Sequence, residues 1–152
     1  PQMPFAGFNT QLHGIAAQHV AGAPRIGEAL ALLAPLLDPH TLIQHSSFDQ
    51  TAVRAACRHF GHAEPRWRWE NSVKIARRAW PEFIGNGGHG LAHLKRQLGL
   101  RFDHHDAGED AKAAAQVVLQ AEARMAMPYD EILLQPGRRA PAPVYPVSGL
   151  IE

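Results

Sequence analysis

Two short acidic motifs contain the residues of this sequence that are best suited to chemistry. The first is His45-Ser46-Ser47-Phe48-Asp49, which follows the apolar residues 41–43. The second is His105-Asp106-Ala107-Gly108-Glu109-Asp110, which opens an alanine-rich stretch. Carboxylates are ligands that suit Mg²⁺ and Mn²⁺, and histidine titrates near neutral pH. The two motifs together could therefore bind a divalent cation and move a proton.

The second motif predicts a helix start that brings a histidine and a carboxylate together. Asp106 followed by Glu109 has the form of an N-cap and the third helical residue. His105 then precedes the cap and Asp110 is the fourth helical residue, and side chains at those two positions meet across the helix entrance. The helix N-terminus favours an ionised Asp110 and a nearby phosphate. Taken alone, such a pattern is more often a plain capping motif with a surface histidine.

The first motif is predicted to lie at the carboxyl end of a strand. Residues 41–45 form a short buried strand in this interpretation, and Ser47 to Gln50 has the form of a capping box. Asp49 then lies in the first turn of a helix, at the edge of an open α/β sheet where ligands bind. Phe48 either packs in the core or stacks against a nucleobase. The motif therefore predicts a ligand site more strongly than either residue does alone.

A coarse pattern of strands and helices positions the two motifs. Besides the strand at 41–45, a second strand is predicted at 67–70. Apolar periodicity, glycine stops and the capping residues Ser47, Ser72 and Asp106 predict the helices, which lie at 25–37, 47–60, 72–80, 91–98 and 106–125. The alternation indicates an α/β fold, yet two short strands are too few for these helices. We therefore expect further N-terminal strands that this sequence lacks.

Composition limits the classes of protein to which the chain can belong. With 152 residues and a 45% hydrophobic share, it has the size of one globular domain. No apolar run approaches the roughly 20 residues of a membrane span, and the first residues do not have the basic-then-apolar pattern expected of a signal peptide. The single cysteine, Cys57, excludes an intrachain disulfide, favours a reducing, cytoplasmic location and is predicted to be a core residue. The net charge of +1 provides no large basic field, so contacts with phosphates must be local or mediated by metal ions.

Together the two motifs resemble the second and third motifs of the DEDDh exonucleases. This family includes the proofreading epsilon subunit of bacterial DNA polymerase III. Residues 9–15, which contain His13-Gly14-Ile15, resemble a family segment that lines the nucleotide pocket. The resemblance covers roughly residues 8–126, so we expect an exonuclease domain at 1–126 and a proline-rich tail or linker at 127–152. Complete members also carry an Asp-x-Glu motif on the first strand, and these 152 residues contain none.

The resemblance implies a fold, an activity and a set of site residues. The fold would be ribonuclease H-like, with a mixed sheet flanked by helices and without its N-terminal strands here. The activity would be 3′–5′ hydrolysis of terminal phosphodiester bonds of DNA or RNA with two Mg²⁺ or Mn²⁺ ions, in proofreading or repair. Asp49 and Asp110 match the metal-binding aspartates, and His105 matches the general base. The positions that match nucleotide contacts are Leu12, His13 and Phe48.

The same resemblance implies partners, and the departures from it leave other functions open. A single-stranded or frayed 3′ end would be the substrate, polymerase or clamp subunits would be partners, and no membrane is involved. Because two of the family's four metal carboxylates have no counterpart, the 152 residues alone are expected to be inactive, and a non-catalytic nucleic-acid-binding or scaffold domain is the alternative. His104-His105-Asp106 is similar to the signature of HD phosphohydrolases, but those are all-helical. Zinc sites at His59 and His62, or at His89 and His93, lack a clear fourth ligand.

Overall fold

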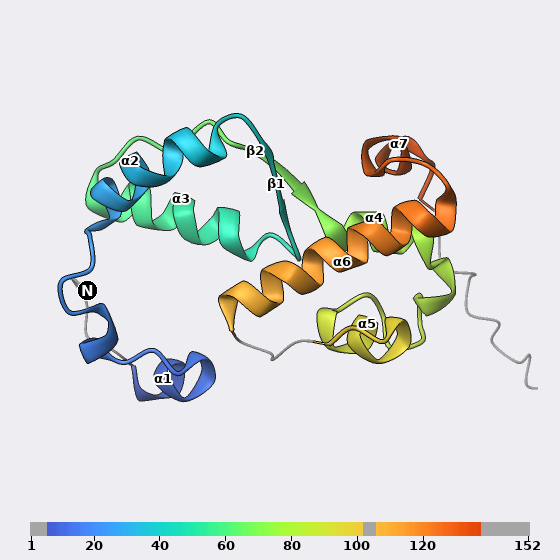
Figure 1. Ribbon diagram of the computed structural model, residues 1–152, viewed down its shortest axis with the longest axis horizontal. Coiled ribbons are helices and arrows are strands. Elements are labelled where there is room, and N and C mark those ends of the chain that lie inside the picture. The colour runs from blue at the N-terminus through green and yellow to red at the C-terminus, as the bar shows by residue number, and fades with distance from the viewer. Residues whose placement is uncertain (1–5, 102–105, 138–152) are drawn as a thin grey trace, which may run out of the picture.

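The computed structural model describes residues 6–101 and 106–137 (Figure 1). Two strands, β1 (Thr41–Gln44) and β2 (Arg68–Asn71), form a parallel pair. The helices, in chain order, are α1 (Gly7–His13), η1 (Ala17–Val20), α2 (Ile26–Leu37), α3 (Phe48–Phe60), α4 (Ser72–Ala79), η2 (Pro81–Phe83), α5 (Leu91–Leu98), α6 (Ala107–Met125) and α7 (Tyr129–Leu134). Both predicted strands and all the predicted helices are confirmed to within one or two residues.

The strands and the helix between them form a β–α–β unit. Thr41 lies opposite Arg68, and Gln44 lies opposite Asn71. Helix α3 makes the crossover that parallel strands need, and it packs against β1 and α2. The pairing within the described residues is parallel only, so the strands that would make the expected sheet mixed are not among them. The unit places the start of α3 at the carboxyl end of β1.

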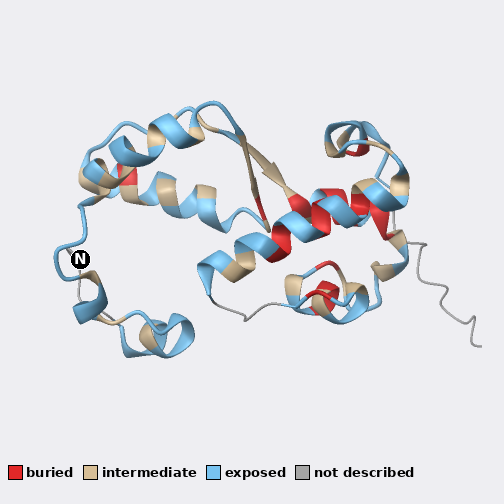
Figure 2. Ribbon diagram, viewed as in Figure 1, coloured by how far each residue is buried: buried red, intermediate tan, exposed pale blue. Residues whose placement is uncertain are grey.

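The core lies among the helices of the C-terminal half. Ile75 of α4, Leu94 of α5, Val117 of α6 and Ile132 of α7 are fully buried in one cluster. Helix α6 presents alanine and valine to α4, which allows the two helices to approach closely (Figure 2). This cluster fixes the axis of α6, and with it the position of the second acidic motif.

The N-terminal segment is packed far more loosely than this core. No residue of α1, η1 or α2 is buried, and these elements are drawn in exposed or intermediate colours (Figure 2). Helix α2 is apolar around most of its circumference but packs chiefly against α3. Large apolar side chains of the segment are consequently exposed: Phe8, Leu12, Ile15, Leu32, Leu33 and Leu36.

Helix capping differs from the sequence-based expectation at two of three helix starts. Asp106 caps α6 as predicted, accepting a hydrogen bond from Glu109 N at 2.9 Å. Helix α4 is capped by Asn71 and not by Ser72, because Asn71 Oδ1 accepts from Val73 N at 2.9 Å. At α3, Ser47 makes no side-chain cap, so the predicted capping box is wrong. Gln44 Oε1, from the end of β1, instead accepts from Gln50 N at 3.0 Å.

The packed part of the chain extends beyond the boundary predicted at residue 126. Residues 129–134 form α7, and Ile132 is fully buried in the core. Glu122 Oε1 accepts from Tyr129 N at 2.8 Å, and Arg78 Nε donates to Gln135 O at 2.8 Å. The rest of the predicted tail, residues 138–152, lies outside the described residues. Among the helices that the structure describes, none combines the length and the apolar character needed to cross a membrane.

Candidate active site

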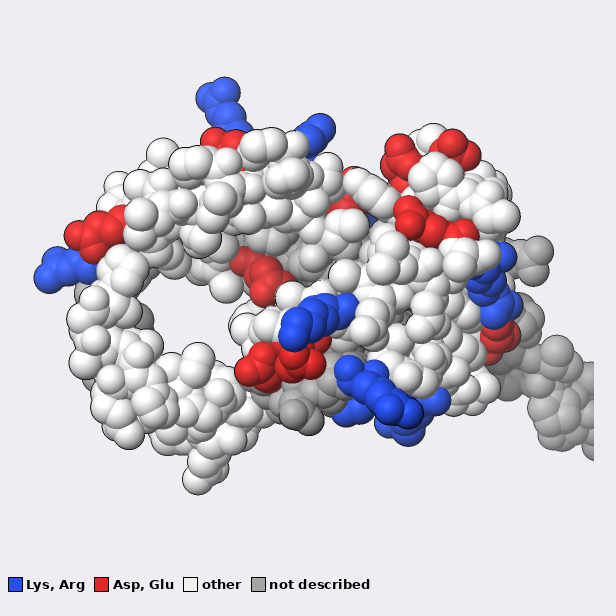
Figure 3. All heavy atoms as spheres, viewed as in Figure 1, with Lys and Arg blue, Asp and Glu red and all other residues white. Residues whose placement is uncertain are grey.

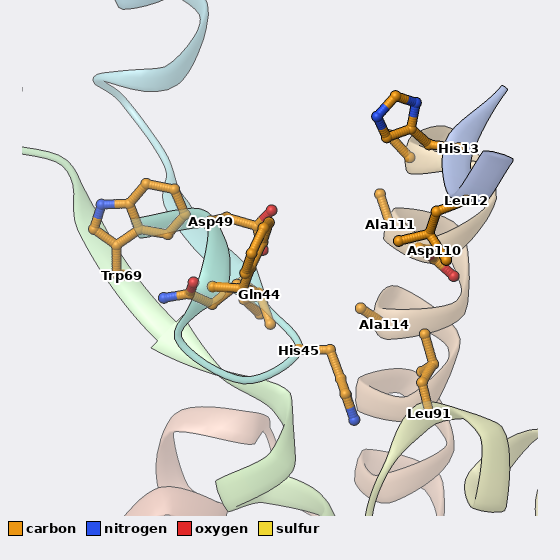
Figure 4. Close-up of a pocket in the computed structure, with 13 residues that line it drawn as sticks. Leu12, His13, Gln44, His45, Asp49, Trp69, Leu91, Asp110, Ala111 and Ala114 are labelled. Atoms are coloured by element: carbon orange, nitrogen blue, oxygen red, sulfur yellow. The ribbon is translucent and has the colours of Figure 1, made fainter. Parts of the chain in front are cut away.

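A pocket of about 500 Å³ opens at the carboxyl end of β1. Its walls come from α1, the start of α3, strand β2 and the N-terminal half of α6 (Figure 4). In the space-filling view, an opening lies between α1, α3 and the start of α6, and acidic atoms lie along its border (Figure 3). Segments far apart in sequence therefore meet at one cavity, and both acidic motifs contribute to it.

The two candidate metal ligands lie on opposite walls of this pocket (Figure 4). Asp49 is in the first turn of α3 and is exposed. Asp110 is in the first turn of α6, is half-buried, and its Oδ1 atom is shielded from solvent. Both carboxylates lie close to a helix N-terminus, where the partial positive charge of the backbone amides also attracts anionic ligands. The arrangement provides two negative groups with a cavity between them.

Apolar side chains supply the part of the lining that could hold a base. The side chain of Phe48 is 74% exposed and borders the pocket, so the core alternative for Phe48 is wrong. Leu12 of α1 is 44% exposed and lies on the α6 side, and Trp69 of β2 lies on the opposite side (Figure 4). Ile43 of β1 also lines the pocket. An exposed ring and an exposed aliphatic group at one cavity are suited to contact with a flat nucleobase.

His13 is held in place by a local hydrogen bond at the end of α1. Its Nδ1 accepts from Ile15 N at 3.0 Å, and Gly14 between them adopts a left-handed conformation at φ 72°. Because Nδ1 accepts, the hydrogen of the neutral ring is on Nε2. The tight turn thus presents His13 to the pocket with a defined donor.

His45 borders the same pocket and is fixed by both of its ring nitrogens. Nδ1 lies 2.9 Å from Ser72 Oγ, and Nε2 lies 3.0 Å from the carbonyl oxygen of His89. Burial lowers the pKa of His45 below its ordinary value, while the His89 carbonyl and the negative charge of Asp110 oppose that effect. A neutral ring is therefore favoured. No role was predicted for His45 from the sequence, although His45 opens the first motif.

The carboxylates at the pocket are of the type that binds a divalent cation, but they are too few to complete its coordination. Carboxylate oxygens are the ligands that Mg²⁺ and Mn²⁺ prefer, and Mg²⁺ is often held by one or two carboxylates together with phosphate oxygens. Within residues 6–101 and 106–137, no three His, Cys, Asp or Glu side chains converge in a metal-binding arrangement. Asp49 and Asp110 could thus supply two of the ligands of a divalent cation, and further ligands would be needed to complete its coordination.

Five of the six residues nominated from the sequence line the pocket: Leu12, His13, Phe48, Asp49 and Asp110. The sixth, His105, lies outside the described residues, as does His104 of the alternative HD signature. The two strands also argue against the all-helical HD fold.

Of the histidines in the zinc alternatives, His89 is engaged with the backbone, because its Nε2 is hydrogen-bonded to Trp80 O at 2.8 Å. Cys57 is buried, as predicted.

Comparison with known proteins decides the family. The RNase T family model, described as Exonuclease, matches residues 2–118, which is most of the chain. The chain belongs to this exonuclease family. The predicted resemblance to the DEDDh exonucleases is thereby confirmed, and the family carries with it the ribonuclease H-like α/β fold and the use of divalent metal ions.

The relatives of this exonuclease-family domain are much longer proteins. The PolC-type DNA polymerase III of Streptococcus thermophilus is 29% identical over 122 residues, which make up 78% of this chain and 8% of that protein. The PolC-type DNA polymerase III of Streptococcus mutans is 28% identical over 120 residues, with the same shares. The chain thus spans about a twelfth of these relatives' length. No solved structure gives a significant match.

Proposed function

We propose that this domain is a 3′–5′ exonuclease that removes terminal nucleotides from DNA or RNA. The observation that carries the proposal is the convergence of both acidic motifs and the candidate nucleotide contacts on one pocket. Leu12 and His13 come from α1, Phe48 and Asp49 from α3, and Asp110 from α6. Chance would not readily bring residues of three separate segments, nominated by one resemblance, to the same cavity.

The proposed reaction is hydrolysis of the last phosphodiester bond. A water oxygen attacks the terminal phosphorus, the bond from phosphorus to the 3′ oxygen breaks, and a nucleoside 5′-monophosphate leaves. His105 accepts the proton of the attacking water, for which a histidine has a suitable pKa range. Asp49 and Asp110 would hold divalent cations, which when bound acidify water and stabilise charge on the phosphate. Two further carboxylates are required for a pair of ions, and an Asp-x-Glu strand outside these 152 residues would supply them.

The walls of the pocket favour an unpaired 3′ end as substrate. Phe48 of α3 and Leu12 of α1 both line the pocket and would hold the terminal base by stacking and apolar contact. Such contacts require the base to leave its stack on the duplex. The near-neutral charge of the chain agrees with a grip on a few terminal nucleotides and not on a long stretch of duplex. A single-stranded or frayed end, as arises in proofreading or repair, fits both features, and polymerase subunits are the expected partners.

The test is cleavage of a 5′-labelled oligonucleotide by the intact protein in Mg²⁺ or Mn²⁺. We expect a ladder that shortens from the 3′ end, and loss of cleavage by on the order of 10²-fold or more in Asp110→Asn and His105→Ala. Asp130→Asn and His59→Ala are the matched controls, because both residues are exposed and lie outside the pocket lining. Near-normal cleavage by Asp110→Asn or His105→Ala would contradict the assignment of these residues to the active site. Cleavage rates of DNA and RNA oligonucleotides of the same sequence measure the preference for deoxyribose or ribose.

A nucleic-acid-binding domain without catalysis is the second candidate. It is favoured by the small number of carboxylates, since no third metal-binding side chain joins Asp49 and Asp110 within the part of the chain that the structure describes. The same oligonucleotide distinguishes the two functions. Binding that is unaffected by Asp110→Asn, together with no cleavage by the unmodified protein, would establish the binding domain.

A further inference from the structure

The contacts of His45 have no part in the chemistry proposed above, yet they join three segments around the pocket. The ring is at the end of β1, Ser72 is the first residue of α4, and His89 precedes α5. The hydrogen-bonded groups are withdrawn from solvent: Ser72 is fully buried and His89 is 6% exposed. Hydrogen bonds in such surroundings are costly to lose, because water does not replace the missing partner.

The network continues on both sides of the imidazole. Ser72 Oγ donates to the carbonyl oxygen of Gln44 at 3.0 Å, which ties α4 to the strand residue before His45. His89 Nε2 is 2.8 Å from Trp80 O, which ties the 85–90 loop to the end of α4. The ring of His45 thus links β1 to α4 directly and to the α4–α5 connection through His89.

The turn that follows His45 is strained. Ser46 has φ 85°, a left-handed conformation that residues with a side chain adopt rarely. Its amide donates to Asn71 Oδ1 at 3.3 Å, and its Oγ accepts from Phe48 N at 3.3 Å. A strained residue persists only where its surroundings determine its conformation, and here those surroundings are Asn71 at the end of β2 together with the hydrogen-bonded end of β1.

We propose that His45 is a positioning residue of the exonuclease site. Its two hydrogen bonds fix the end of β1 and therefore the Ser46 turn, and this turn sets the direction of Phe48 and Asp49 opposite Asp110. The inference rests on the proposed function, because the residues that His45 positions are Phe48, the proposed nucleobase contact, and Asp49, the proposed metal ligand. It assigns to His45 no contact with substrate.

The geometry also defines the tautomer that this role requires. The carbonyl oxygen of His89 can only accept, so Nε2 of His45 carries the hydrogen. Nδ1 of the neutral ring can then only accept, so the single hydrogen of the Ser72 hydroxyl can point to Nδ1 or to Gln44 O and serves one of them at a time. A glutamine at position 45 could place an amide donor near the position of Nε2, whereas phenylalanine fills the volume and donates nothing. These two substitutions separate hydrogen bonding from packing.

The test compares His45→Gln, His45→Phe and Ser72→Ala in the intact protein, with His40→Ala, an exposed histidine directly before β1, as the control. We expect His45→Phe to raise KM and lower kcat, reducing kcat/KM by up to about 100-fold, because small displacements of reacting groups have effects of that size. His45→Gln should recover much of this loss, and Ser72→Ala should fall between the two. Nitrogen NMR shifts should show the hydrogen of His45 on Nε2.

Amide hydrogen exchange at residues 46–50 provides a readout that does not depend on cleavage. We expect faster exchange there in His45→Phe than in the unmodified protein and in His40→Ala, at matched thermal stability. Equal exchange, or wild-type kinetics in a stably folded His45→Phe, would overturn the positioning role. If the unmodified protein cleaves nothing while exchange in His45→Phe is faster, the proposed function fails and the control of the Ser46 turn by His45 stands.

Discussion

Helices α2 and α6 differ in how far their apolar residues are buried. Helix α2 is the more apolar of the two, with the sequence IGEALALLAPLL, yet none of its residues is buried. Helix α6 has five buried residues, because α4, α5 and α7 all pack against it. Apolar composition alone therefore does not create a core, which needs partner elements on the appropriate faces.

The pocket lies where these two kinds of packing meet. Asp110 is carried by the well-packed helix α6, and Leu12 and His13 are carried by α1, which has no buried residue. Asp49 is between these extremes, on α3, whose single fully buried residue is Cys57. The difference indicates that the second acidic motif is placed by the core, whereas the candidate nucleotide contacts of α1 are held by few interactions.

Core truncation should show the largest contrast between the two regions. Ile75→Ala removes a fully buried side chain of α4 and should lower the free energy of unfolding by about 2–5 kcal/mol. Leu36→Ala on α2, where the side chain is 65% exposed, should change it by no more than about 0.5 kcal/mol. Urea unfolding of both variants measures the difference. Comparable losses would mean that α2 is packed in solution as tightly as α4.

Substitution of one glycine in each region should give the next largest difference in stability between the two regions. Gly14, after α1, and Gly87, before α5, both have a left-handed backbone, which costs an alanine about 1–2 kcal/mol at either position. An added Cβ meets nothing within 4 Å at Gly14, but at Gly87 it would collide with the buried ring of His93. That ring packs edge-on against Phe83, so Gly87→Ala should cost a further 1–3 kcal/mol or so. Thermal unfolding of Gly14→Ala and Gly87→Ala should show this order, and equal midpoints would contradict it.

The smallest expected effect is the change of folding stability with pH that is due to His45, which lines the pocket between the two regions. The folded-state pKa of His45 is lowered by burial, with Asp110 and His89 as the charged and titratable groups that act on it. The unfolded chain then binds more protons than the folded chain once the pH falls below the ordinary histidine value of about 6.5. The contribution of His45 is therefore complete above that pH and declines as the solution becomes more acidic, until the folded-state pKa is passed.

Denaturant unfolding from pH 8 to pH 5 measures this decline. The loss of stability on acidification should be smaller in His45→Gln, which cannot take up the proton, than in the unmodified protein. His40→Gln, which changes an exposed histidine, is the control and should retain the full decline. An identical pH dependence in all three proteins would show that His45 is not protonated more readily in the unfolded chain.

Local patterns in the sequence predicted most of the elements, and contacts between distant segments account for the differences. The Asp106 cap of α6 and the glycine ends of α3 and α5 depend on neighbouring residues only, and they were predicted correctly. The start of α3 is held by Gln44 of the preceding strand, which no capping pattern reveals. Helix α7 is short and flanked by prolines, so its burial through Ile132 depends on the prior packing of α4 and α6.

The candidate site was predictable to the extent that its residues belong to motifs. The resemblance nominated Asp49, Asp110, Phe48, Leu12 and His13, and the structure brings these residues to one pocket. It gave no role to His45, because the bonds of that ring go to a hydroxyl and a backbone carbonyl in other segments. A backbone acceptor has no signature in the sequence, so only the folded structure reveals the network.

The absence of buried residues in α1 has a consequence for the thermodynamics of ligand association. A ligand held between Leu12 and Phe48 would have to restrict a helix that the rest of the protein restrains weakly. Part of the favourable contact free energy would then offset the entropy lost by α1, and the measured affinity would be lower than the contact area suggests. Helix α1 regains this entropy when the ligand departs, which favours rapid release of the ligand over tight retention.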